Sequence, residues 1–404
     1  MLKVQNARRW IRDVTVKKDK GRKALLILLL IFPLLLAGCW NNRPLTEINI
    51  VAGMGLERTE DGTILVTVQV AEPGAIQPAS AGGGSGGEKS KPVFVASNEG
   101  ETVFEALRGM LAVVDKKLFL STAQVLIIGE KLAQEGIGEI LDFFERDHEV
   151  SYLVDVIVAK DATPDELLRI ESDMDTIPAV YIRGTVENTA ARGTVKKTLL
   201  IDLFKDMDCK GRQPTAGQIT KSSDKEVRTE GLAVFRDGKL AGWLNPYETR
   251  GFLFANNELK GGIVNVPVDN GKAAFEIIRS KGSVSVEVED GKPSMLIIRV
   301  NAEANVGEYG SGGRLDSLET LYMLEEKLGE EIGKEIEMAL EKCQKEFASD
   351  IFGFGIYLHK YYPKCWKEVE NDWHNIFSKL PADIRVDAKI MRVGLVINPV
   401  GKGE

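Results

Sequence analysis

The residues that could ligate a metal or act as nucleophiles are few and widely spaced. Cys343, His359, Cys365 and His374 are the densest group of thiols and imidazoles in the sequence. Their spacing matches no zinc-binding pattern, and no H-E-x-x-H motif is present. A disulfide between the two cysteines, a metal site and unpaired, partly buried thiols all remain open, and the sequence favours unpaired thiols. We therefore expect no metal, no cofactor and no catalytic residue.

Three other features resemble parts of catalytic or ligand-binding sites but lack the surrounding sequence that such sites require. Gly83 to Gly87 reads G-x-S-x-G, yet a nucleophile elbow needs a strand before its serine and a helix after it. Glu308 to Leu315, EYGSGGRL, precedes a helical pattern but lacks the G-K-[ST] ending of a phosphate loop. His148 lies among charged residues at a predicted helix end, where a solvated turn is expected. None of the three indicates an enzyme.

One cysteine does lie in a sequence that predicts a covalent modification. Residues 1–23 carry nine Lys/Arg, and the apolar run from Ala24 to Ala37 has 14 residues. That run is too short to span about 30 Å of hydrocarbon and is typical of an export signal. Leu36-Ala37-Gly38-Cys39 resembles the bacterial lipobox, in which the cysteine receives diacylglycerol and the chain is cleaved before it. We predict a cleaved signal peptide over 1–38 and a lipid anchor on Cys39. An uncleaved signal anchor is the alternative, although it would need a longer apolar core.

The rest of the chain is acidic and long enough for more than one hydrophobic core. Residues 1–38 hold nine of the 52 Lys/Arg and two of the 60 Asp/Glu, so residues 39–404 carry a formal charge of −15. This charge argues against nucleic acid as a partner, because no basic stripe remains to neutralise phosphates. At roughly 150 residues a domain, the length predicts two or three domains.

The hydrophobic pattern of residues 39–208 predicts an α+β domain with a mixed sheet and packed helices. Two β-branched runs joined by Asp61-Gly62 predict a hairpin, and the Gly/Ser/Pro-rich residues 73–92 predict a flexible loop. Helices and strands then alternate. The expected elements are strands at Asn49 to Leu56, Thr63 to Ala71, Ala123 to Ile128 and Tyr152 to Ala159, and helices at Thr102 to Val114, Lys131 to Glu145 and from Thr163 onward.

The remaining residues predict two further domains. Short strands around the turn Arg236 to Lys239 indicate a small middle domain over 209–260, with a helix capped by Asn245 and begun by Pro246. Residues 261–404 predict a C-terminal α+β domain. Its antiparallel meander has expected turns at 269–271, 281–282 and 290–291, and a last strand over 384–400. The apolar stripe from Leu318 to Phe347 predicts a long helix that covers this sheet, with a coiled-coil arm as the alternative. The fold class is thus α+β, in three domains.

Four stretches spread over nearly the whole exported chain carry a resemblance to a known family. They are LAGCWNNRPLTEINIVAGMGLE, LSTAQVLIIGEKLAQEGIGEILDFFERDHEV, EGLAVFRDGKLAGWLNPYETRGFLF and SDIFGFGIYLHKYYPKCWKEVENDWHNIF. In these stretches the chain resembles the Ger(x)C family, the lipoprotein C subunits of bacterial spore nutrient germinant receptors. The resemblance implies a three-domain α+β fold without catalytic activity. It also implies a place on the outer face of the inner spore membrane, beside an A subunit and an integral B subunit.

Within these stretches we single out Glu248, Arg250, Asp350 and Trp366 as candidate positions for a partner interface, while roles within the fold would explain them equally well. The aromatic residues from Asp350 to Trp373 are interpreted as core, with exposed members available to a partner. Two other functions stay open. A solute-binding lipoprotein of a transporter is disfavoured by the antiparallel C-terminal strands. A cell-wall hydrolase is disfavoured because the acidic residues mostly lie on predicted helix faces, where solvation explains them.

Overall fold

A computed structural model describes residues 44–72, 92–147, 149–268, 271–310, 315 and 317–392. Cys39, the signal peptide over 1–38, His148, most of the glycine-rich loop and the last predicted strand beyond Arg392 lie outside the described residues. The chain forms two units, Met1–Ile48 and Asn49–Glu404. The first contributes a 3₁₀ turn at Leu45–Glu47, and the features below belong to the second. Over the described ranges, no helix has the length and apolar character needed to cross a bilayer.

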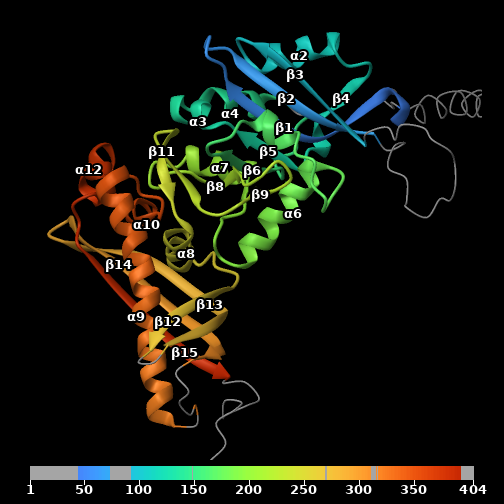
Figure 1. The fold of residues 1–404 in the computed structure, drawn as a ribbon. Coiled ribbons are helices and arrows are strands. Elements are labelled where there is room, and N and C mark those ends of the chain that lie inside the picture. Colours follow the sequence, from blue (N-terminus) through green and yellow to red (C-terminus); the bar gives the residue numbers. More distant parts are fainter. Residues whose placement is uncertain are drawn as a thin grey trace, which may run out of the picture. The chain divides into compact units, whose positions relative to one another are not determined.

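The first sheet is mixed and, in the described part of the chain, has eleven strands (Figure 1). The hairpin of its first two strands is antiparallel, with Arg58 opposite Ile64, as the Asp61-Gly62 turn predicted. β1, β5, β6 and β8 run parallel, so their amino ends share one edge. The strand order is β11 (Lys239–Leu244), β10 (Leu232–Arg236), β8 (Thr215–Lys221), β6 (Asp155–Ala159), β5 (Val125–Ile128), β1 (Ile48–Arg58), β2 (Ile64–Ala71) and β3 (Val93–Gly100), with β4 (Lys117–Phe119) beside β1, β7 (Thr198–Leu199) beside β6 and β9 (Val227–Arg228) beside β8.

Helices cover both faces of this sheet because successive side chains of its central strands alternate. Leu126 and Ile128 face one core, whereas Val125 and Ile127 face another. This burial on both faces explains why the central strands are continuous apolar runs. The first core includes α2 (Val103–Gly109), α3 (Glu130–Glu135), α4 (Gly138–Arg146) and α7 (Leu200–Met207), and the second includes α5 (Pro164–Leu168) and α6 (Pro178–Ala191).

The helix predicted over Lys131 to Glu145 is in fact two helices, α3 and α4. Gly136 separates them with φ of 134°, which residues with a side chain rarely adopt. The next N–H, of Ile137, donates to the carbonyl oxygen of Gly238 at 2.9 Å, so the break lies where the helices meet the β10–β11 turn. The prediction of one continuous helix was therefore wrong.

The second sheet has four strands in the described residues, in the order β12 (Gly262–Val268), β13 (Gly271–Glu289), β14 (Lys292–Tyr309) and β15 (Ala382–Arg392). The first three are antiparallel, as predicted. β15 joins β14 in parallel, from Leu296 opposite Ala382 to Asn305 opposite Arg392. A parallel partner needs a long crossover, and the helices between the two strands supply it.

The turn predicted at Lys281-Gly282 was wrong, because β13 continues through both residues. Gly282 pairs with Val300 in the β13–β14 ladder. A Cβ atom at Gly282 would lie 2.0 Å from the carbonyl oxygen of Phe254 in α8 (Pro246–Ala255). Glycine is therefore needed here for the close approach of two backbones rather than for a turn.

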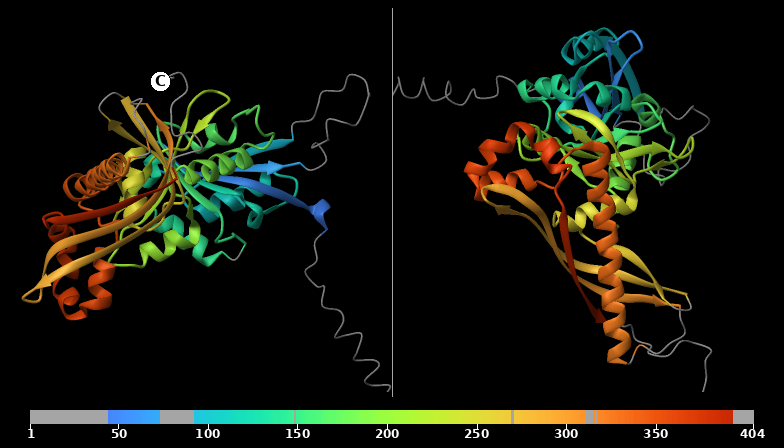
Figure 2. Two further views of the ribbon diagram at one scale, coloured as in Figure 1. Left: turned by 90° about the horizontal axis from the view of Figure 1, so that it is seen from below. Right: turned by 90° about the vertical axis from the view of Figure 1, so that its left-hand side faces the viewer.

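A long helix, α9 (Leu318–Lys342), lies along the second sheet (Figure 2). Its Leu324, Leu328, Ile332 and Ile336 are fully buried, which confirms the prediction that the helix covers the sheet. A π-helical turn, Cys343–Phe347, extends it. The same core contains α8, α10 (Phe354–Tyr361), α11 (Pro363–Val369) and α12 (Trp373–Phe377).

Strand β10 belongs to both cores and connects them. Its Leu232 and Val234 pack into the core of the second sheet, and its Ala233 and Phe235 pack into a core of the first. Helix α8 follows directly after β11, so the chain passes from one core to the other within a few residues. The candidate residues on α8 and in the segment after α9 therefore lie close to this junction.

Candidate functional site

The motif Glu-Thr-Arg-Gly, residues 248–251, lies in the first turns of α8. The side-chain oxygen of Asn245 accepts hydrogen bonds from the N–H groups of Tyr247 (2.9 Å) and Glu248 (3.0 Å). In return, Glu248 Oε2 accepts from the N–H of Asn245 at 2.7 Å. This reciprocal cap, with Pro246 at the first helical position, explains why the helix begins here, as the sequence predicted. From Glu248 onward, α8 is buried.

Both charged residues of the motif pair with side chains of α9. Arg250 is 5% exposed and donates through Nε to Glu335 Oε2 at 2.8 Å and through Nη2 to Glu335 Oε1, a bidentate ion pair. Its Nη1 donates to the carbonyl oxygen of Ile263 in β12 at 2.6 Å. Burial raises the pKa of Glu335, and the hydrogen bonds from Arg250 oppose that rise. Glu248 accepts from Nζ of Lys342 at 3.1 Å.

The two uncharged residues of the motif allow the helices to approach. A Cβ atom on Gly251 would lie 2.1 Å from the carbonyl oxygen of Glu335, so a larger residue would push α9 away. Thr249 is fully buried, and its hydroxyl donates to the carbonyl oxygen of Leu244 at 3.5 Å. All four residues of the motif therefore hold α8 against its surroundings, and Arg250 ties it to both α9 and β12.

Asp350 is 1% exposed and organises the turn before α10. Its Oδ1 accepts from the N–H groups of Gly353 (2.8 Å) and Phe354 (3.3 Å), and its Oδ2 accepts from the N–H of Gly355 (2.9 Å) and from Nε1 of Trp373 (2.9 Å). Burial raises the pKa of Asp350, while these four donors act in the opposite direction. One carboxylate thus fixes the start of α10 and ties it to α12.

Trp366 belongs to the same cluster through Trp373. The two indole rings meet edge to face, with centroids 5.7 Å apart, and Trp366 is 2% exposed. Tyr361 and Tyr362 are exposed. The aromatic segment is therefore mostly core, as interpreted, with two tyrosines on the surface.

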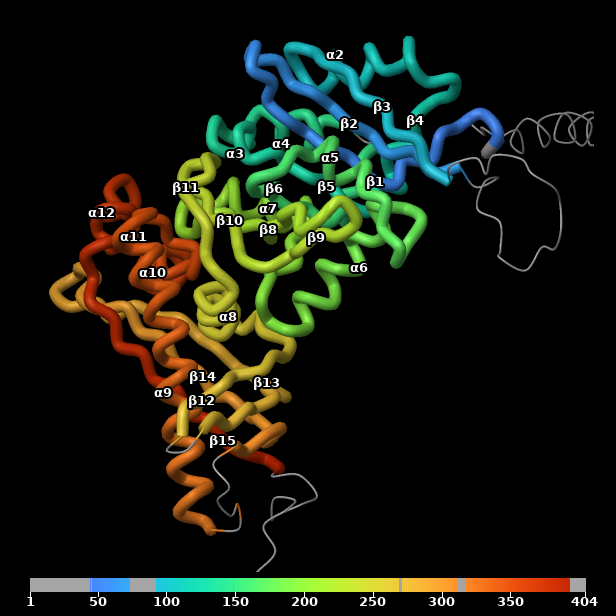
Figure 3. Tube along the Cα trace, viewed as in Figure 1, coloured from blue at the N-terminus to red at the C-terminus, as the bar shows by residue number. Residues whose placement is uncertain are grey.

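The segment around Asp350 also docks on the first sheet, where Figure 3 shows α10 to α12 beside β11. The carbonyl oxygen of Asp350 accepts from the N–H of Gln213 at 2.8 Å, and the hydroxyl of Ser349 donates to the carbonyl oxygen of Phe235 at 2.6 Å. Farther along, the N–H of Ile356 donates to the carbonyl oxygen of Gly211 at 3.1 Å. These bonds join the segment after α9 to the first sheet, whereas the α8–α9 pair lies within the core of the second sheet.

The structure thus places the four candidate residues in two buried contact regions rather than on one open surface. Glu335 and Lys342, the partners of Arg250 and Glu248, were missed by sequence reasoning. One signal was available for Glu335, because it falls three residues after Ile332 on the apolar stripe of the long helix. A charged residue on a buried stripe needs a buried partner of opposite charge, because an unpaired buried charge is costly.

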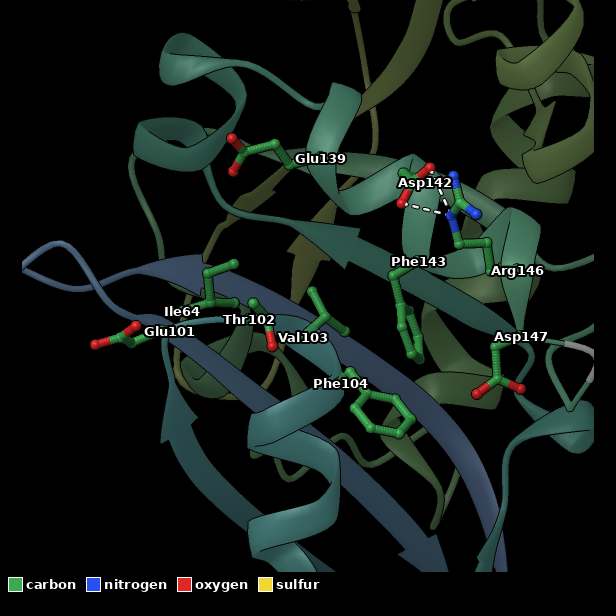
Figure 4. Close-up of a pocket in the computed structure, with 10 residues that line it drawn as sticks. All are labelled: Ile64, Glu101, Thr102, Val103, Phe104, Glu139, Asp142, Phe143, Arg146 and Asp147. Carbon is green, nitrogen blue, oxygen red and sulfur yellow. Dashed lines mark hydrogen bonds and ion pairs between the residues drawn. The ribbon is translucent and has the colours of Figure 1, made fainter.

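A cavity of about 350 Å³ opens between α2 and α4 (Figure 4). Phe104 and Phe143 line it, with ring centroids 6.4 Å apart. Arg146 is held by Asp142, with Nε 2.9 Å from both carboxylate oxygens. The hydroxyl of Thr102 caps α2, so the lining offers apolar contact and charge rather than a nucleophile. Four carboxylates surround the cavity: Glu101, Glu139, Asp142 and Asp147.

Across the described residues, no three His, Cys, Asp or Glu side chains converge to hold a metal ion. Cys209, Cys343 and Cys365 are free thiols, the state that the sequence favoured. Burial raises the pKa of both Cys343 and Cys365, which keeps these two thiols protonated and poorly reactive.

Comparisons with known proteins cover most of the chain. Residues 41–221 match the family described as spore germination protein N-terminal domain, and residues 230–394 match spore germination B3/GerAC like, C-terminal. Spore germination protein KC of Bacillus subtilis (strain 168) is 28% identical over 94% of this chain and 98% of that protein. Spore germination protein B3 of the same organism is 22% identical over 90% of this chain and 96% of that protein.

The fold also has a counterpart among solved structures. The crystal structure of the GerBC protein matches 84% of this chain and 97% of that chain, with a TM-score of 0.53 and 18% identity. The α+β fold with two sheets and a long C-terminal helix over the second is therefore shared with that protein. Because family matches cover both halves, the chain belongs to the GerAC family of spore germination proteins.

Proposed function

We propose that this protein is the C subunit of a spore nutrient germinant receptor, anchored to the outer face of the inner spore membrane by diacylglycerol on Cys39. In this role it works beside an A subunit and an integral B subunit, and nutrients trigger the release of ions and dipicolinate. The observation that carries the proposal is the family match over 41–221 and 230–394. The lipobox at Leu36 to Cys39 supports the anchor.

We propose further that the subunit acts by assembly or signalling and not by catalysis. The supporting observation is that the polar groups of the candidate residues form hydrogen bonds and ion pairs with other groups of this chain. Glu248 and Arg250 are paired with α9, and Asp350 accepts four N–H donors. Side chains engaged in this way stiffen the core of the second sheet. A rigid body at the end of a lipid tether suits a subunit that transmits force or holds partners.

The test replaces Cys39 by alanine in the producing cell. We expect the variant to leave the membrane fraction and the spores to lose their response to nutrient, while germination by direct dipicolinate treatment survives. Cys209→Ala is the matched control, because it removes a half-buried thiol that has no lipidation sequence. Normal fractionation and a normal nutrient response of Cys39→Ala would refute the anchor.

A further inference from the structure

Apolar side chains are exposed at the edge of the first sheet where the parallel strands begin. Val113 is 62% exposed, Phe119 is 43% exposed and Leu153 is 71% exposed. We name these three residues the edge patch. Phe119 ends β4, Val113 precedes it, and Leu153 lies two residues before β6. Exposed apolar residues are common singly, but three at one sheet edge call for an explanation.

Contacts of their neighbours hold the three residues at the same edge. β4 pairs with β1. Asn49 at that start donates through Nδ2 to Asp115 Oδ1 at 3.3 Å. On the other side, Lys117 of β4 forms an ion pair with Glu149, which precedes Leu153 by four residues. The segments before β1, β5 and β6 are therefore tied together.

The strand register supports the same arrangement. Gly53, Val125 and Asp155 lie opposite one another in the parallel strands β1, β5 and β6. Leu153 and Phe119 both lie on the amino-terminal side of this row, and so does Asn49. The edge patch is thus on the side of the sheet from which the chain leads back to residue 39.

The length of that connection limits how far this edge can be from a lipid on Cys39. Cys39 and Asn49 are ten residues apart. A fully extended chain spans at most about 3.3–3.6 Å per residue, so the start of β1 lies within about 35 Å of the anchored sulfur atom.

The charges beside the edge patch are close to balanced, because Asp115 and Lys116, which are exposed between Val113 and Phe119, have opposite signs. Lys117 is paired with Glu149, and buried Asp155 has Nζ of Lys197 at 3.4 Å and Nε of Arg183 at 3.8 Å. Tyr152 adds an aromatic ring that is 40% exposed, with its hydroxyl bonded to the carbonyl oxygen of Glu145. Aromatic and aliphatic side chains with nearby paired charges suit the interface between water and acyl chains.

We propose that the edge patch contacts the lipid surface to which Cys39 tethers the chain, with Val113, Phe119 and Leu153 entering the interfacial layer. This inference rests on the proposed lipid anchor and adds the orientation of the domain on the membrane. The amino edge of the first sheet faces the bilayer, and the strands run away from it. Apolar faces that bind this way lie about 5–10 Å deep at the boundary of headgroups and acyl chains.

The test places an environment-sensitive label on the lipid-modified full chain. Leu153→Cys, in a Cys209→Ser background, is labelled with a nitrobenzoxadiazole dye and reconstituted in phosphatidylcholine vesicles with or without doxyl-labelled lipid. Leu318→Cys is the matched control, because Leu318 is 69% exposed on α9 against 71% for Leu153. We expect a blue shift and a loss of fluorescence with doxyl lipid at 153, and neither at 318. Equal responses at the two positions would overturn the proposal.

Flotation of the same vesicles separates this inference from the proposed anchor. A chain that does not float with the vesicles contradicts the lipid on Cys39, and the orientation with it. A chain that floats while the label at 153 stays in water keeps the anchor and rejects the lipid contact. If the label at 153 is shielded only after the A and B subunits are added, the lipid contact is also rejected, because the edge patch would then bind protein. Urea unfolding of Leu153→Cys checks that the exposed substitution leaves the fold intact.

Discussion

We expect Arg250→Met to destabilise the chain strongly, although the residue lies in no cleft. Arg250 makes two hydrogen bonds to Glu335 and one to the carbonyl oxygen of Ile263. Both charges are almost fully buried. Removing one partner of a buried ion pair leaves the other charge uncompensated and typically costs about 3–5 kcal/mol. We therefore expect the free energy of unfolding to fall by about that amount.

A double variant shows how much of this loss comes from the unpaired charge. Arg250→Met with Glu335→Met removes both charges and keeps the apolar volume. Only the carbonyl oxygen of Ile263 then lacks its donor, which costs about 1–3 kcal/mol. The double variant should therefore be more stable than either single variant. If the double variant lost as much free energy of unfolding as the two single variants together, Arg250 and Glu335 would have no interaction energy, and our reasoning would be wrong.

The assay is urea unfolding of purified residues 39–404, followed by tryptophan fluorescence. Trp366 and Trp373 lie in the core that α8 and α9 share, so their emission reports its opening. Arg146→Met is the matched control, since Arg146 is 78% exposed and pairs with Asp142 on the same surface helix. Exposed pairs of this kind contribute little, and we expect no measurable change. Unfolding of Arg250→Met at the same urea concentration as Arg146→Met would refute the prediction.

Three further variants test the other contacts by the same method. Asp350→Ala leaves four N–H donors without an acceptor and should cost about 3–5 kcal/mol, more than Trp373→Phe, which removes one of them. Gly251→Ala should also destabilise, because the new methyl group would collide with the backbone of α9, and an unchanged unfolding midpoint would contradict that contact. Burial raises the pKa of Asp155, so its contribution to stability is present below the ordinary value of 3.8 and is lost as pH rises through the folded value. Compared with Asp155→Asn, the wild type should therefore gain stability as pH falls from about 7 toward about 4, and parallel curves would exclude this.

Local signals in the sequence predicted several of the helix and hairpin boundaries. Asn245 and Pro246 predicted the start of α8, and Thr163 with Glu166 forms the cap expected for α5. The Asp61-Gly62 turn likewise predicted the first hairpin. Each of these signals depends on atoms only a few residues apart, so the sequence carries it directly.

Contacts between segments far apart in the sequence could not be predicted from such local signals. In the sequence, Gly282 could not be distinguished from a turn glycine. Glycine is required there because the backbone of α8, nearly thirty residues earlier, approaches it closely. Arg250 and Glu335 are 85 residues apart, and the donors to Asp350 include a tryptophan 23 residues away. Such residues look like surface charges until the chain is folded. The motif residues were therefore recognisable as a group, while their role in holding α8 and the turn before α10 was not.

The parallel pairing of β15 with β14 has a consequence for the order in which the chain can fold. The described strands of the first sheet all belong to residues 48–244, whereas the fourth described strand of the second sheet, residues 382–392, comes last. Until then, one side of the 18-residue strand β14 has unpaired backbone N–H and C=O groups, which can pair with other chains. Domains fold as they emerge, the N-terminal one first. Residues 382–392 thus cover a strand edge at which newly made molecules could pair, and we expect a stop codon before residue 382 to favour aggregation more than the small loss of sequence suggests.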